Sequence, residues 1–253
     1  MKKDSLNSKL TWFLGEFAVV VTGVLVALAL NAWWQGRQDR SFERQYVDQL
    51  EQDIVQTIAG IEGASDADAR SDRALTMLIR AYRTDPAPPR DSLLRWSINA
   101  PNVVLTAPIL GTAETIVSSG DLRLIRDDSL RLSLPSFLES SKELAENMAL
   151  FGRQFVDGAR ALTGHIDYYG VLQEALPKSL IDSLAIANPM FPLPADARMR
   201  QMSGDVAEIL NSLEAYQTLS YMHTVQRNLD ATRDAILDEH RTMLERVQVA
   251  RGE

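Results

Sequence analysis

The 253-residue chain contains no cysteine and only three histidines. Without thiols, the sequence excludes disulfides, cysteine nucleophiles, and zinc or iron–sulfur sites that cysteine would hold. The histidines, His165, His223 and His240, lack the spacing of a helical zinc-binding pair such as HExxH. Walker, GxGxxG and GxSxG motifs are also missing. We therefore expect no enzyme, no metal site and no bound cofactor.

Positive charge is also too scattered to indicate a nucleic-acid-binding protein. The chain has 26 Lys and Arg against 34 Asp and Glu, which gives a formal net charge of -8. A sequence-independent nucleic-acid binder gathers its Lys and Arg on one face. The hydrophobic fraction of 45% and charged fraction of 24% are instead those of an ordinary globular protein. The length allows one helical domain of roughly 200 residues besides an anchor.

One long stretch lacks charge altogether. No Asp, Glu, Lys or Arg occurs from Phe17 to Gly36, which is enough residues to cross a bilayer. Trp12 and the pair Trp33-Trp34 lie about 21 residues apart, or roughly 32 Å along a helix, which is close to the thickness of the hydrocarbon core. Tryptophan is typical of both membrane interfaces. A soluble helix of this length would show a polar face, which this stretch lacks. The sequence predicts a transmembrane helix over 10–34.

A cleaved signal peptide is the alternative to a permanent anchor. The N-terminal tail, residues 1–9, carries Lys2, Lys3 and Lys9, and Ala27-Leu28-Ala29 resembles a cleavage site. The apolar stretch is nevertheless longer than the usual 7–15-residue core of a signal peptide, and it continues past that site. An uncleaved signal-anchor is therefore favoured.

The orientation of this anchor depends on the charges beside it. The lysines of the tail are nearly balanced by Arg37, Arg40 and Arg44 on the other side. A short basic tail followed by an acidic domain is nevertheless the usual arrangement of a signal-anchor. We expect a protein of the bacterial inner (cytoplasmic) membrane, with its N-terminus in the cytoplasm and the bulk of the chain in the periplasm.

Small side chains recur every four residues within the predicted anchor, at Gly15, Val19, Gly23, Ala27 and Asn31. Such a ridge lets a neighbouring helix approach closely, and the amide of an asparagine can hydrogen-bond across the contact. Glycine and alanine are also common in membrane helices for reasons of composition alone. Taken as an interface, the ridge predicts packing against other membrane subunits or against a second copy of the chain.

Glu16 is the single acidic residue near the start of the anchor. It lies about one turn inside the aromatic girdle, where its carboxylate can reach the headgroups or contact a partner. A proton-binding role is the other interpretation of a carboxylate at this depth, and the first two are favoured. We include Glu16 with the ridge as part of the expected packing interface within the lipid bilayer.

Two segments resemble a known family. The segment LGEFAVVVTGVLVALALNAWWQGRQDRSFERQYVDQLEQDI (14–54) contains Gly15-Glu16, Gly23, Ala27-Leu28, Asn31 and Trp33. This order resembles the opening of bacterial single-pass membrane proteins that are grouped as a domain of unknown function. TAETIVSSGDLRLIRDDSLRLSL (112–134) is similar to a second part of that family. Together the segments cover about a quarter of the chain. Pro135 and the proline-rich stretch 188–194 depart from the family pattern. The resemblance implies an anchored helical domain and no particular activity.

Apolar residues beyond the anchor recur at three- and four-residue steps, which predicts helices and no strands. The anchor should continue as a helical stalk over 35–62 and break at Gly63, and a helical bundle should occupy 63–253. We expect the connector PNVVLTAPIL (101–110) to be buried against this bundle. Gly120 has the position of a helix-ending glycine in the left-handed conformation. The predicted fold class is all-α, with one transmembrane helix, a stalk and an up-and-down bundle.

A stripe of carboxylates in the predicted C-terminal helix resembles a cation site. It consists of Asp230, Asp234 and Asp238, at steps of four residues. Arg233 and Arg241 follow two of these residues at steps of three, so a solvated, ion-paired helix face is the favoured interpretation.

Three classes of function remain to be compared. An accessory or scaffolding subunit of a larger membrane complex, for example a respiratory or photosynthetic energy-transducing one, fits the small-residue ridge. A periplasmic ligand-binding or sensor domain on a membrane anchor is the alternative, but a tail of about ten residues cannot form an output domain. An enzyme is disfavoured because no catalytic motif occurs. The accessory subunit is therefore the preferred hypothesis.

The expected orientation predicts the outcome of reporter fusions. A periplasm-dependent reporter fused after Glu253 should be active, because the domain follows a single span whose N-terminus is cytoplasmic. A reporter that works only in the cytoplasm should be silent at the same position. The opposite pair of results would reverse the topology.

Overall fold

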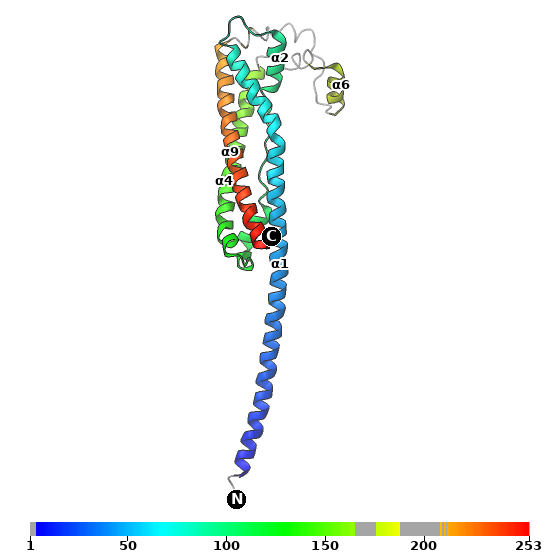
Figure 1. Cartoon of the computed structure of the whole chain (residues 1–253), viewed down its shortest axis with the longest axis vertical. Coiled ribbons are helices and arrows are strands. Elements are labelled where there is room, and N and C mark those ends of the chain that lie inside the picture. The colour runs from blue at the N-terminus through cyan, green and yellow to red at the C-terminus, as the bar shows by residue number, and fades with distance from the viewer. Residues whose placement is uncertain (1–3, 165–175, 188–207, 209, 211, 253) are drawn as a thin grey trace.

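The computed structural model describes residues 4–164, 176–187, 208, 210 and 212–252, except for the side chains of 4–15, 18, 19, 164 and 184–187. Within these ranges the chain forms six α-helices and one 3-10 helix (Figure 1). The elements are α1 (Asp4–Ala81), α2 (Arg90–Asn99), α3 (Gly111–Ser119), η1 (Asp121–Leu124), α4 (Asp128–Gly164), α6 (Lys178–Ala187) and α9 (Leu213–Arg251). No strand occurs in the described ranges, so the predicted all-α class is confirmed there.

Helix α1 is a single helix of 78 residues, and the predicted break at Gly63 is wrong. Glycine weakens a helix interior by only about 0.5–1 kcal/mol. Buried side chains lie on both sides of it, with Ile61 before it and Ala64, Asp68 and Ser71 after it. Because most helical stability in proteins comes from the packing of a buried face, this packing outweighs the local preference of the glycine.

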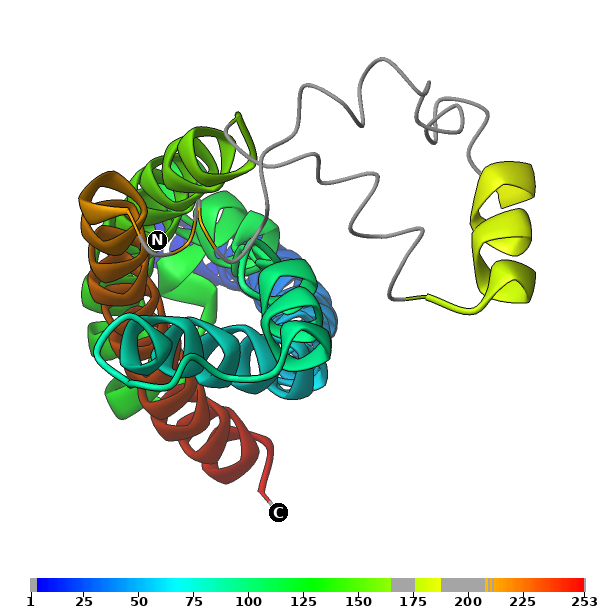
Figure 2. The same cartoon turned by 90° about the horizontal axis from the view of Figure 1, so that it is seen from above.

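Helix α9 packs between α1 and α4 and runs antiparallel to both. Arg251 at its end pairs with Glu51 of α1, while Tyr216 near its start stacks on Tyr82 with the ring centroids 4.6 Å apart. Helices α1 and α4 therefore run in the same direction, as the views along and across the bundle show (Figures 1 and 2). The return path between them includes an extended segment, so the long helices do not follow the expected up-and-down order.

The extended connector, residues 101–110, is held by side chains of the long helices. Its backbone N–H groups donate to α1: that of Val104 to Asp68 Oδ1 (3.4 Å) and that of Ile109 to Thr57 Oγ1 (2.9 Å). Arg233 of α9 donates to the Val104 carbonyl oxygen (2.7 Å). Backbone polar groups that leave water need such partners, so these side chains allow a non-helical segment to lie along the bundle.

The connector is only half-buried, which corrects the expectation that it is buried throughout. Leu105 packs on α4, where a Cβ added to Gly152 would lie 2.5 Å from its Cδ1. Glycine at position 152 therefore permits the close approach. Leu105 itself remains 47% exposed, and Val104 and Ile109 are also exposed.

The core consists of two hydrophobic clusters along the bundle. One cluster surrounds Phe155 of α4 and includes Leu219 and Met222 of α9. The other includes Val47, Leu50 and Ile54 of α1, together with residues of α3, α4 and α9. The predicted stalk over 35–62 is thus part of the bundle from Val47 onward.

Local signals account for several boundaries. Gly120 ends α3 with φ 79° and ψ 13°, the left-handed conformation expected of it. Helix α4 continues through Pro135, because the packing of its apolar face outweighs the cost of about 3 kcal/mol that a proline imposes inside a helix through a lost hydrogen bond and a steric clash. Helix α9 begins at Leu213, where the Ser212 hydroxyl accepts a hydrogen bond from the Ala215 N–H. The proline-rich stretch 188–194 and His165 lie outside the described residues.

The described residues contain no helical segment that is both long and apolar enough to cross a membrane. The half of α1 that precedes the bundle nevertheless carries many exposed apolar side chains. Every described side chain from Val20 to Gln35 is exposed, including Leu25 at 60% and Trp34 at 63%.

Two glycine substitutions test the continuity of α1. Gly63→Ala should stabilise the protein by about 0.5–1 kcal/mol, because a Cβ there would contact nothing within 4 Å and alanine favours the helix. Gly120→Ala is the matched control and should destabilise it by roughly 1–2 kcal/mol, because its φ is positive. Urea unfolding of the full chain in mild detergent, followed by circular dichroism, measures both. Destabilisation by Gly63→Ala would show that α1 does not continue through this position.

Candidate membrane-interface site

A stripe of one aromatic and three basic side chains runs along α1 just before the bundle. Trp33, Arg37, Arg40 and Arg44 follow one another at steps of four, three and four residues. This spacing places them on one face of the helix. The guanidinium carbon of Arg37 lies 5.9 Å from the centroid of the Trp33 ring, within the range of a cation–π contact.

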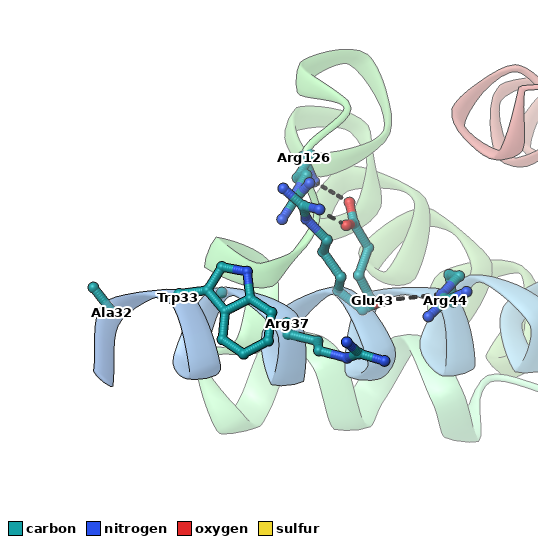
Figure 3. Close-up of a pocket in the computed structure, with 8 residues that line it drawn as sticks. Ala32, Trp33, Arg37, Glu43, Arg44 and Arg126 are labelled. Carbon is teal, nitrogen blue, oxygen red and sulfur yellow. Dashed lines mark hydrogen bonds and ion pairs between the residues drawn. The ribbon is translucent and has the colours of Figure 1, made fainter. Parts of the chain in front are cut away.

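A fourth arginine reaches this face from another part of the chain. Arg126 lies between η1 and α4, and Glu43 of α1 binds it twice (Figure 3). The Arg126 backbone N–H donates to Glu43 Oε1 at 2.7 Å, and the Arg126 Nε lies 3.3 Å from Oε2. The next residue, Asp127, accepts a hydrogen bond from the Leu130 N–H (2.7 Å) and so caps the first turn of α4.

The preceding turn is also fixed to α1. The Tyr46 hydroxyl of α1 donates to Asp121 Oδ2 at 2.8 Å. Hydrogen bonds from Tyr46 and Ser119 hold the pKa of the Asp121 carboxyl below its usual range, and the hydrogen bond to Asp121 raises the pKa of the Tyr46 hydroxyl. Hydrogen bonds therefore join α1 to the turn at Asp121 and to Arg126 itself.

An open hollow of about 730 Å³ lies between this part of α1 and Arg126, and we call it the arginine pocket. It is lined by Ala32, Trp33, Gly36, Arg37, Arg40, Glu43, Arg44 and Arg126.

Positive charge dominates the arginine pocket. Its lining contains four arginines and one carboxylate. That carboxylate, of Glu43, already forms an ion pair with Arg126. Within the described part of the chain, Arg37, Arg40 and Arg44 form no ion pair with a carboxylate; Arg44 Nε donates only to the carbonyl oxygen of Arg40 (3.3 Å). Such an arrangement suits an anionic group that approaches from outside.

The residues expected to form a packing interface lie earlier in the same helix, before Trp33. Gly23, Ala27 and Asn31 are exposed, and a Cβ added to Gly23 would contact nothing within 4 Å. Glu16 is exposed as well. The side chains of Trp12 and Gly15 are not among those that the structure describes. The structure of one chain brings the ridge against no other described element, so the ridge stays a prediction.

Two of the tryptophans that are predicted to lie at a membrane interface are exposed. Trp33 is 61% exposed and Trp34 is 63% exposed. Trp33 also lines the arginine pocket, which joins the expected aromatic girdle to the basic stripe.

A second polar region lies between α1 and α9, around a buried ion pair. Arg233 is 6% exposed and pairs with Asp68 (3.0 Å) and Asp230 (2.9 Å). Burial raises the pKa of both carboxyls, although the charge of Arg233 acts in the opposite direction. The prediction of a solvated helix face is therefore wrong at Arg233, which joins α1, α9 and the connector.

The groove above this ion pair has a volume of about 660 Å³ and is lined by acidic residues and two arginines. No group of three or more His, Asp or Glu side chains in the described ranges is placed to hold a metal ion. His223 instead lies 3.4 Å from Asp72, and His240 is buried beside Phe137. Burial lowers the pKa of His240. These contacts place both histidines in the packing between helices.

Comparison with known proteins gives no match to a protein-family model, a curated protein or a solved structure. The family resemblance of segments 14–54 and 112–134 therefore stays a prediction.

Part of the arginine pocket can be recognised from the spacing of its residues in the sequence. The helical spacing of Trp33, Arg37, Arg40 and Arg44 is sufficient to place them on one face. From the sequence alone, these arginines bear only on the orientation of the predicted anchor. No local pattern indicates Arg126, because it lies 83 residues from its partner Glu43.

Proposed function

We propose that this chain is a membrane-anchored accessory or scaffolding subunit of a larger membrane assembly. Residues 10–34 of α1 cross the inner membrane once, the N-terminus lies in the cytoplasm, and the helical bundle lies in the periplasm. The chain acts through binding and positioning, without catalysis of its own.

The observation that carries this proposal is the contrast between the two halves of α1. From Val47 onward its apolar side chains lie in the core of the bundle. Before the bundle they are uncovered, with Phe17 58% exposed and Leu28 60% exposed. Contiguous exposed apolar surface of this kind marks a contact with a membrane or with another protein.

The full sequence supports a membrane as the main surrounding of this half. The uncharged stretch Phe17 to Gly36 includes residues 18 and 19, whose side chains lie outside the described ones. A 20-residue uncharged stretch, with Trp12 before it and Trp33-Trp34 near its end, fits the thickness and the interfaces of a bilayer.

The small-residue ridge supports a partner within the membrane. Glycine costs helix stability, and no described contact within the chain requires one at position 23. A neighbouring helix would explain the glycine at position 23, because the absence of a side chain lets two helix backbones approach closely. The amide of Asn31 on the same ridge would add a hydrogen bond of roughly 0.6–2 kcal/mol across that contact.

Substitution of Gly23 tests this assignment. Gly23→Leu should reduce co-purification of the partner subunits in mild detergent, because a larger side chain separates the packed backbones. It should not reduce membrane insertion, since it raises hydrophobicity. The set of co-purifying proteins is compared by quantitative mass spectrometry with that of the wild type.

The matched control is Val24→Phe, which enlarges the adjacent side chain away from the ridge. If Gly23→Leu retains every partner as well as Val24→Phe does, the ridge is not the interface. The proposal of a partner subunit within the membrane would then lose its support, and the membrane anchor would be unaffected.

A further inference from the structure

We propose that the arginine pocket binds the phosphate group of an anionic phospholipid headgroup. This inference rests on the proposed function, because an anchored α1 is what places the pocket beside the bilayer. It adds a specific ligand to a part of the chain that would otherwise serve only as a connection.

The chemistry of the pocket fits a phosphate. A guanidinium group presents its N–H donors in a planar fork that matches the oxygens of a phosphate, and the paired charges strengthen these hydrogen bonds. Three such groups, on Arg37, Arg40 and Arg44, form no ion pair with a described carboxylate. The nearby Glu43 does not neutralise them, because Arg126 already binds both of its carboxylate oxygens.

The position along α1 fits the headgroup layer. Arg37, Arg40 and Arg44 lie roughly 6 to 16 Å beyond Trp33 at 1.5 Å per residue. The polar layer on each side of a bilayer is about 5–8 Å thick, and electrostatic interactions extend about 8–10 Å further at physiological salt. With Trp33 at the interface, Arg37 lies in this layer, at about 6 Å, while Arg40 at about 10 Å and Arg44 at about 16 Å lie beyond it but within reach of the lipid charge.

The size of the pocket and the end of the bundle beside it also favour a lipid. A volume of about 730 Å³ has room for a headgroup in addition to its phosphate. Leu132 in the second turn of α4 is 76% exposed, and Val249 in the last turn of α9 is 68% exposed. Both belong to the end of the bundle that is next to the pocket, where exposed apolar side chains favour contact with lipid over contact with water.

Lipid selectivity of the full chain tests the inference. The purified protein is reconstituted into phosphatidylcholine vesicles that contain a small fraction of spin-labelled phosphatidylglycerol or spin-labelled phosphatidylcholine, and the fraction of motionally restricted label is measured. The wild type should prefer phosphatidylglycerol by roughly fivefold or more, because each basic residue near an anionic lipid contributes about 1 kcal/mol. The combined variant Arg37→Gln, Arg40→Gln, Arg44→Gln should lose most of this preference.

A control variant changes the same number of charges at the far end of the same helix. Arg70→Gln, Arg73→Gln, Arg80→Gln replaces three exposed arginines of α1 and should keep the wild-type preference. Equal loss in both variants, or equal retention in both, would overturn the inference. The circular dichroism of each variant should equal that of the wild type, since all six arginines are exposed.

Arginine side chains would bind free phosphate through the same hydrogen bonds, so a separate experiment must distinguish it from lipid. Inorganic phosphate should not reduce the phosphatidylglycerol preference more than sodium chloride does at equal ionic strength. A specific reduction by phosphate would identify a free anion as the ligand and overturn the assignment to lipid.

An alkaline carbonate wash of the same vesicles separates this inference from the proposed function. Wild-type protein that stays with the vesicles but shows no lipid preference would overturn the inference alone. Wild-type protein released by the wash would overturn the membrane anchor as well.

Discussion

The continuity of α1 is the constraint on which the rest of the structure depends. One helix of 78 residues, roughly 117 Å long at 1.5 Å per residue, contains both the uncovered apolar half and one wall of the bundle. The helix is unbroken from the apolar half to Val47, where the bundle begins, and within the bundle it also continues through Gly63. Packing of α9 along Ile54, Ile61 and Asp68 maintains this continuity despite the glycine. The bundle is therefore held at a fixed distance from the apolar half.

The path of the connector then determines where the arginine pocket forms. The chain leaves the far end of α1 through α2 and returns as an extended segment, whose backbone groups are satisfied by Thr57, Asp68 and Arg233. This return places α3, η1 and the start of α4 beside the first buried turns of α1. Arg126 thereby meets Glu43 at the end of the bundle nearest the apolar half. A buried polar network at one place thus positions a basic group at another.

Local signals in the sequence predicted the helical class, the apolar stretch and the left-handed turn at Gly120. These features depend on side-chain periodicity or on the conformational freedom of one residue. The features that sequence reasoning missed depend on contacts between distant segments. Packing on both sides of Gly63 overrides its weak helix propensity, and the burial of Arg233 requires Asp68, which lies 165 positions earlier in the chain. The arginine pocket could be predicted in part from the sequence, since three of its arginines share a helical face. The position of Arg126 could be known only from the fold.

The central claim is that the first half of α1 lies in a bilayer and that Trp33 marks its surface. Because the chain has no cysteine, Val24→Cys, Gln38→Cys and Gln56→Cys each introduce a single thiol for a spin label. The measurement is the accessibility of each label to oxygen, which concentrates in lipid, relative to a water-soluble nickel complex, in the full chain reconstituted into vesicles. The account predicts a ratio highest at position 24, much lower at 38 and lowest at 56. A label at position 24 that is as accessible to nickel as the label at position 56 would contradict it.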